Sequence, residues 1–86
     1  DSLARLREVG RVLQTNGWVL SNLDATILAQ APKMAPHILR MRQNIADALG
    51  VSIDQISVKA TTEEGLGFTG AKEGIAAHAV CLIDKL

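Results

Sequence analysis

Aromatic side chains are almost absent from this sequence of 86 residues, where one Trp and one Phe make up 2% of the composition. Hydrophobic residues nevertheless reach 48%. The core must therefore consist of Leu, Ile, Val and Ala, which suits a compact layer of sheet and helix. A chain of this length forms at most one small domain.

The chain also has a single cysteine and a formal net charge of zero. Cys81 is the only cysteine, so no disulfide can form within the chain, which is consistent with a reducing compartment. Nine basic and nine acidic residues cancel, and this argues against bulk nucleic-acid binding, which usually needs a basic surface. No apolar run approaches the ~20 residues that span a bilayer, and no signal sequence opens the chain. Because the sequence begins with Asp1 rather than Met, we expect a fragment of a longer protein.

The first part of the chain predicts a helix followed by a long strand. Residues 2–16 carry an apolar helical face, and Gly17 is placed to end the helix. Residues 18–29 alternate between apolar and polar in the manner of a strand, with a break at Ser21. Asp24 lies in the middle of this strand, either exposed on a wet face or at a subunit interface.

The later part predicts a second helix over residues 36–49 and a strand within residues 51–60. Lys59, at the end of that strand, is either a solvated charge or a ligand for a phosphate. Residues 75–84 are apolar at both alternating sets of positions, which suits a buried strand or a buried helix. The glycines before this segment favour a strand.

Two segments abandon the hydrophobic pattern. The first, Lys59-Ala-Thr-Thr-Glu-Glu-Gly-Leu-Gly-Phe-Thr-Gly70, offers hydroxyls, carboxylates and glycines. Consecutive backbone N–H groups in such a loop can cradle a phosphate, and a neighbouring carboxylate can hold the accompanying divalent metal. In the second, residues 29–34, small alanines leave room for a flat ring and Pro32 interrupts the strand. Either segment can also be a plain connection.

Three further patterns are weaker. The spacing from Gly67 to Gly70 matches the GXXG loop of KH RNA-binding domains, but such a loop joins two helices on a basic surface. His78 and Cys81 are three positions apart, so on a strand they point to opposite faces and do not form half of a zinc site. Cys81 and Ser57 lie in apolar strand patterns, which favours packing over nucleophilic catalysis.

The segment from Lys59 to Gly70 resembles a loop of the 2-C-methyl-D-erythritol 2,4-cyclodiphosphate synthase family. Asp24-Ala-Thr-Ile-Leu-Ala-Gln-Ala-Pro-Lys-Met34 is similar to a second motif of that family, as are Asp1-Ser2 and Glu73-Gly-Ile-Ala-Ala. The resemblance spans essentially the whole chain but only the later half of the family's domain. It implies that residues 1–86 are the C-terminal portion of a single synthase domain.

The resemblance implies an α/β (α+β) fold, with helices on one face of a mixed sheet, that assembles as a homotrimer with active sites between subunits. It implies a cyclising phosphorus–oxygen lyase of non-mevalonate isoprenoid precursor biosynthesis. The substrate, 4-diphosphocytidyl-2-C-methyl-D-erythritol 2-phosphate, would yield the cyclic 2,4-diphosphate and CMP. The expected location is the bacterial cytoplasm or a plastid-type organelle, with no membrane or nucleic-acid partner.

Site residues follow from the resemblance position by position. Thr62 and Glu64 are expected to serve catalysis, and Glu64 to hold Mg²⁺ or Mn²⁺ near the diphosphate. The family's zinc ligands belong to a segment preceding residue 1, so we expect no zinc ligand in this chain and no activity from it alone. The expected substrate-binding residues are Ala29, Ala31, Pro32, Lys33, Met34, Ala35, Thr61, Thr62 and Phe68.

The chain departs from the family pattern at Glu63, Gly65 and Ala71-Lys72. The family commonly has Thr, Lys and Arg-Gly there, and the Arg helps to bind anions in the trimer cavity, near which Phe68 and Glu73 also fall. Two alternatives are a non-catalytic nucleotide- or phosphate-binding module that uses the same two segments, and a KH-like RNA-binding domain.

Overall fold

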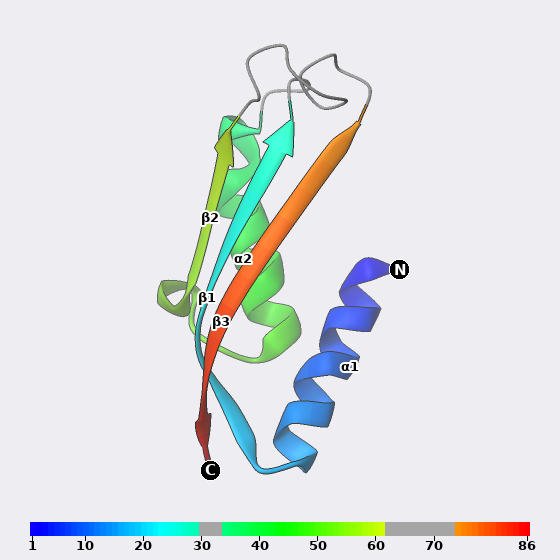
Figure 1. Ribbon diagram of the computed structural model, residues 1–86, viewed down its shortest axis with the longest axis vertical. Coiled ribbons are helices and arrows are strands. Elements are labelled where there is room, and N and C mark those ends of the chain that lie inside the picture. Colours follow the sequence, from blue (N-terminus) through cyan, green and yellow to red (C-terminus); the bar gives the residue numbers. More distant parts are fainter. Residues whose placement is uncertain (30–33, 62–73) are drawn as a thin grey trace.

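The computed structural model describes residues 1–29, 34–61 and 74–86. In these ranges the strands form one three-stranded sheet in the order β2-β1-β3, in which β1 runs parallel to β2 and antiparallel to β3 (Figure 1). The sheet is accompanied by two helices, so the fold is a mixed α+β arrangement. The elements are α1 (Ser2–Thr15), β1 (Trp18–Ala29), α2 (Ile38–Leu49), β2 (Ile56–Thr61) and β3 (Ile75–Lys85), with short 3₁₀ turns at Ala35–His37 and Ile53–Gln55.

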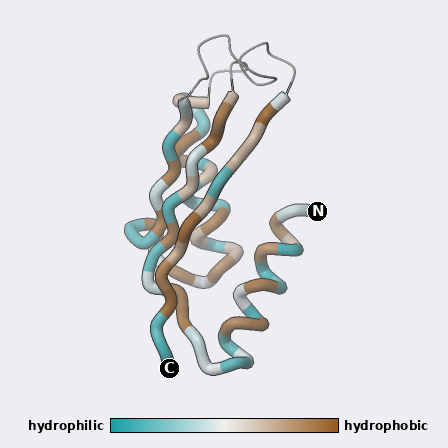
Figure 2. The backbone as a smooth tube through the Cα atoms, in the orientation of Figure 1, coloured by the Kyte–Doolittle hydropathy of each residue, from teal (hydrophilic) through white to brown (hydrophobic). Residues whose placement is uncertain are grey.

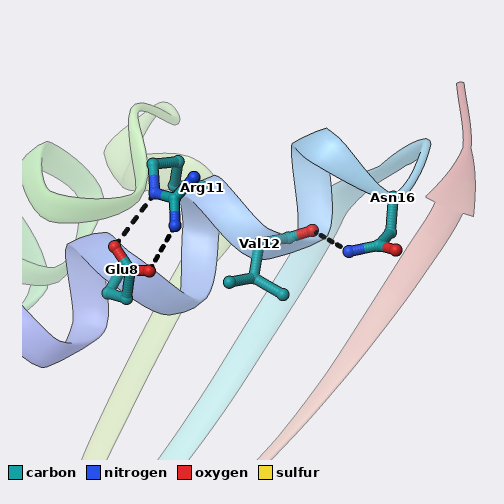
Figure 3. A network of polar contacts seen from close by, with 4 residues as sticks. All are labelled: Glu8, Arg11, Val12 and Asn16. Atoms are coloured by element: carbon teal, nitrogen blue, oxygen red, sulfur yellow. Dashed lines mark hydrogen bonds and ion pairs between the residues drawn. The ribbon is translucent and has the colours of Figure 1, made fainter.

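Helix α1 follows its predicted range to within one residue. Asp1 caps it, because the side chain accepts a hydrogen bond from the backbone N–H of Leu3 at 2.8 Å. Gly17 follows the helix with a positive φ of 85°, as the sequence predicted. Figure 3 shows the exposed Glu8–Arg11 pair one turn apart on this helix. The hydrogen bond from Arg11 lowers the pKa of the Glu8 carboxyl.

Helix α2 begins two residues later than predicted. The segment from Ala35 to His37 forms a 3₁₀ turn instead, and the His37 N–H donates to the Met34 carbonyl at 2.8 Å. This bond spans three residues, which is the 3₁₀ pattern rather than the α-helical one. The predicted end at residue 49 is confirmed, and Gly50 terminates the helix in the left-handed conformation with φ of 69°.

The core lies between α2 and the face of the sheet that it covers. Ile56 is 0% exposed and Ala46 is 1% exposed, and Leu20 completes this buried cluster. Helix α1 packs against α2 and the start of β1. At Gly10, an added Cβ would lie 3.3 Å from Leu49 Cδ2, so α1 and α2 pack closely at this glycine.

A β-bulge at Ser21 interrupts the ladder between β1 and β3. The register shifts between Leu20 and Asn22, at the position where the sequence alternation breaks. The Gln55 side chain donates to the carbonyls of Leu20 and Ser21 at 3.2 and 2.9 Å. The bulge is therefore tied to the turn that precedes β2.

Strand β3 confirms the prediction of a strand but not that of burial. Its contacts are mainly with β1, and in the single chain ten of its eleven residues are exposed while Ala76 is half-buried. Figure 2 shows that hydrophobic residues nevertheless dominate much of its length. It forms an edge of the described sheet, and no helix packs extensively on it. Among the described helices, none combines the length and the apolar character needed to cross a membrane.

Candidate functional site

The parallel pairing of β1 and β2 brings the two candidate segments to one edge of the sheet. The ladder runs from Leu23 opposite Ile56 to Leu28 opposite Thr61. Since parallel strands point the same way, the segments that follow both strands leave the sheet at the same edge. The predicted base-binding segment follows β1, and the predicted diphosphate segment follows β2. Ligands of open sheets commonly bind beyond the carboxyl ends of the strands.

Four predicted site residues belong to the described part of the chain. Ala29 ends β1, Thr61 ends β2, and Met34 and Ala35 enter the 3₁₀ turn before α2. The remaining predicted positions lie outside the described residues and stay predictions. They are Ala31, Pro32, Lys33, Thr62, Glu64, Phe68 and Glu73.

Ala29 and Thr61 occupy opposite faces of the sheet. Side chains alternate along a strand, so Ala29 shares the face of Leu23 and Ala25, toward α2, whereas Thr61 shares the face of Lys59. Ala29 is 6% exposed and its strand partner on β3 is Ile75. A larger side chain at position 29 would have to displace its neighbours, which is consistent with the prediction that this position takes a small residue.

Met34 and Ala35 lie at the start of the 3₁₀ turn. Met34 is half-buried and Ala35 is exposed. The Met34 carbonyl is already engaged by the His37 N–H. Neither residue adds a charged or ionisable group to the predicted base-binding segment.

Lys59 forms a contact that the sequence did not reveal. Its Nζ lies 2.6 Å from Oδ1 of Asp24 on the neighbouring strand. Neither expectation for Lys59, a solvated charge or a phosphate ligand, included this ion pair. The two residues are 35 positions apart, and only the parallel register of β1 and β2 places them side by side. The sequence does show opposite charges on two segments in which apolar and polar residues alternate. That signal identifies a particular ion pair only once the register of the two strands is known.

The described residues contain no group of three or more His, Cys, Asp or Glu side chains that could hold a metal ion. Glu64, the predicted ligand for Mg²⁺ or Mn²⁺, lies outside the described residues. The expectation of zinc ligands in a preceding segment likewise stays a prediction.

The arrangement of the strands does not favour the KH-like alternative. A KH loop joins two helices, but the segment that contains Gly67 and Gly70 is preceded by strand β2 and followed by strand β3. His78 pairs with Thr26 and Cys81 with Leu23 across the ladder. Their spacing on this strand sends the two side chains to opposite faces, as expected.

Comparison with known proteins gives a consistent result. The family model described as the YgbB family matches residues 1–84. A 2-C-methyl-D-erythritol 2,4-cyclodiphosphate synthase from Clostridium perfringens is 60% identical over 85 residues, which cover 99% of this chain and 54% of the relative. A synthase of the same name from Trichlorobacter lovleyi is 61% identical over 83 residues, 96% of this chain and 53% of the relative. The chain thus spans about half the length of these curated relatives.

Solved structures show the same relationship in the fold. A 2C-methyl-D-erythritol 2,4-cyclodiphosphate synthase from Plasmodium vivax matches 100% of this chain and 57% of its own, with a TM-score of 0.96 and 34% identity. A Plasmodium falciparum IspF in complex with CDP matches 99% of this chain and 55% of its own, with a TM-score of 0.93 and 30% identity.

Proposed function

Because the chain belongs to the YgbB family, we propose that it forms the C-terminal half of a 2-C-methyl-D-erythritol 2,4-cyclodiphosphate synthase. The proposed reaction converts 4-diphosphocytidyl-2-C-methyl-D-erythritol 2-phosphate into the cyclic 2,4-diphosphate and releases CMP. This is a cyclising phosphorus–oxygen lyase reaction that supplies an isoprenoid precursor. Curated relatives of this name at 60% identity carry the proposal.

The placement of the two candidate segments supports a cytidine diphosphate substrate. Both follow parallel strands at one edge of the sheet, so a single extended ligand can reach both. The related Plasmodium falciparum protein was solved with CDP. We assign the base to the segment that starts at Ala29 and includes Ala31, Pro32, Lys33, Met34 and Ala35. The diphosphate is assigned to Thr61 and Thr62.

The substrate carries its own nucleophile, since its 2-phosphate attacks the β-phosphate and CMP leaves. The protein has to fold the substrate into that geometry and stabilise the charge that develops on the leaving group. Hydroxyl groups such as that of Thr62 donate hydrogen bonds to phosphate oxygens, and these bonds are stronger than those between neutral groups.

The carboxylate of Glu64 is a suitable donor for Mg²⁺ or Mn²⁺, which prefer oxygen ligands. A bound divalent cation would neutralise charge on the phosphates. We place the zinc ligands of the complete enzyme in the segment that precedes this chain in its relatives. We therefore expect the 86 residues to be inactive by themselves.

We also propose that the complete protein is a homotrimer with active sites between subunits. The exposed apolar side chains of β3 support an assembly, because Val80 and Leu82 are 69% and 62% exposed in the single chain. Phe68 and Glu73 would lie near the threefold axis. The substitution of Ala71-Lys72 for the family's Arg-Gly replaces a guanidinium by an ammonium group and shifts the positive charge by one residue.

The proposed division of labour can be tested in the complete protein that contains this chain. Thr62→Val should weaken diphosphate binding by about 1.5–3 kcal/mol, the typical worth of a hydrogen bond to a charged group. Glu64→Gln should reduce the dependence on Mg²⁺ or Mn²⁺, since an amide oxygen is a poorer ligand than a carboxylate. Ala29→Leu should block the binding of CDP but not the binding of pyrophosphate. Calorimetry with CDP, CMP and pyrophosphate, together with CMP release from the substrate, measures each effect.

Two results would contradict these assignments. One is an Ala29→Leu protein that loses CDP and pyrophosphate equally, and the other is a Glu64→Gln protein that keeps its full metal dependence. The unsubstituted protein provides the reference, and absence of CMP release from it in the presence of zinc and magnesium would reject the proposed activity itself.

A further inference from the structure

One ion pair joins β1 to β2 on the face of the sheet that α2 does not cover. Asp24 and Lys59 are diagonal neighbours, since the register pairs Asp24 with Ser57 and Lys59 with Thr26. Their charged atoms are 2.6 Å apart, and the two side chains remain 48% and 59% exposed. Leu23, Ile56 and Val58 alternate with them and pack toward the core, which places the pair on the opposite face.

The pair lies close to the candidate site along both strands. Lys59 is two residues before Thr61, which corresponds to about 7 Å of extended backbone. Asp24 is five residues before Ala29 on the parallel strand. At the other end of the same pairing, Gln55 ties the start of β2 to the bulge of β1. Of these two links between β1 and β2, the ion pair is therefore nearer to the strand ends that the two candidate segments follow.

We propose that the Asp24–Lys59 pair is a positioning device for the cytidine diphosphate site, an inference that rests on the proposed function. By holding β2 against β1, it sets the separation between the base-binding and the diphosphate-binding segments. Lys59 acts through the strand rather than on the phosphate, because its ammonium group is engaged by the Asp24 carboxylate. The pair as a whole carries no net charge that would attract an anion.

The surroundings of the pair agree with this role. A shallow hollow of about 150 Å³ is lined by Asp24, Thr26, Lys59, His78, Ala79 and Val80. Thr26 is the cross-strand partner of both Lys59 and His78. The ion pair is therefore part of a row of side chains that crosses all three strands, and such cross-strand contacts stabilise pairing.

The test compares Asp24→Asn, Lys59→Met and the charge-exchanged double variant Asp24→Lys/Lys59→Asp in the complete protein. Calorimetry measures binding of CDP, which reaches both segments, and of cytidine, which reaches only the base-binding one. Exposed ion pairs have coupling energies that correspond to about two- to fivefold in an equilibrium constant. Each single variant should therefore weaken the binding of CDP by about two- to fivefold and leave the binding of cytidine unchanged. The double variant should recover most of the lost CDP affinity.

Four outcomes would overturn the inference. A much larger loss with Lys59→Met than with Asp24→Asn, without recovery in the double variant, would make Lys59 a direct phosphate ligand. Equal loss of CDP and cytidine with a lower unfolding midpoint would indicate a purely structural role. A change in sedimentation coefficient that accompanies the loss of CDP affinity would place the pair at a subunit contact. Unchanged CDP affinity in both single variants would remove the role altogether. If the unsubstituted protein bound neither ligand, the proposed function would fall, and this inference with it.

Discussion

At the scale of single residues, the described core depends on very few side chains. Ile56 is 0% exposed and is the only large side chain in the described residues that is fully buried. It opens β2 and packs against Ala46 and Leu20. Arg42 of α2 also donates to the Ile56 carbonyl at 2.7 Å. One residue thus joins the helix to the sheet through both its side chain and its backbone.

We expect Ile56→Ala to lower the free energy of unfolding by about 2–5 kcal/mol, because it leaves a cavity in a small core. Ile56→Val should cost about 0.5–1.5 kcal/mol, since it removes a single methylene. Urea denaturation measures both, and the exposed Arg40→Ala serves as the control, expected within about 0.5 kcal/mol of the parent. Equal values for Ile56→Ala and Arg40→Ala would contradict the importance assigned to Ile56.

At the scale of elements, a side chain from outside the strands supports the register of the sheet at the β-bulge. Gln55 belongs to the 3₁₀ turn before β2, and its side chain bridges that turn and the β1 bulge. Its Nε2 donates to the carbonyls of Leu20 and Ser21, while its Oε1 accepts from the Ser52 N–H at 3.0 Å. A slip of one residue would move every side chain of a strand to the other face. Gln55 opposes such a slip where β1 is irregular.

Replacing Gln55 by Leu should cost about 1–3 kcal/mol, the usual penalty for leaving part-buried backbone groups without a partner. Gln43→Leu is a matched control, because in the described residues Gln43 donates to the exposed Asp47 side chain of the same helix rather than to part-buried backbone. That variant should stay within about 0.5 kcal/mol of the parent. Denaturant unfolding of both variants provides the comparison, and a Gln55→Leu protein as stable as Gln43→Leu would show that the bulge needs no such clamp.

At the scale of the whole molecule, the described chain is asymmetric. Its helices and its core lie with β1 and β2, while β3 contributes a strand that is hydrophobic yet exposed. An exposed, apolar edge strand is a template for pairing with other chains. The relatives are about twice as long as this chain, and in proteins of that length further residues are available to cover such a surface.

The 86-residue chain produced by itself should therefore self-associate through β3. Leu82→Lys places a charge on that strand and should reduce the association, because edge lysines block strand pairing. Leu39→Lys is the control, since Leu39 is 66% exposed, much as Leu82 is at 62%, but lies on α2. Sedimentation velocity at several concentrations measures the effect. An equal reduction by both substitutions would indicate general hydrophobic association rather than association through β3.

Much of the fold could be predicted from the sequence because its signals are local. Apolar spacing indicated both helices and β1, Gly17 marked the end of the first helix, and the alternation broke at Ser21, where the structure has its bulge. The start of α2 differed by two residues, because local pattern does not separate neighbouring backbone states. The residues around Pro36 suit the first turn of an α-helix, yet they form a 3₁₀ turn that is closed by the Met34 carbonyl.

The sequence by itself determined the family and the two segments to which the chemistry is assigned in the proposal, because both depend on the identity and order of residues along the chain. Only the tertiary structure decided how the strands that lead into those two segments lie relative to each other. The parallel register of β1 and β2 brings their ends to one edge and joins Asp24 to Lys59. It also decided that β3 is exposed, because burial depends on which elements pack against a strand, whereas its hydrophobic pattern is the same in either environment.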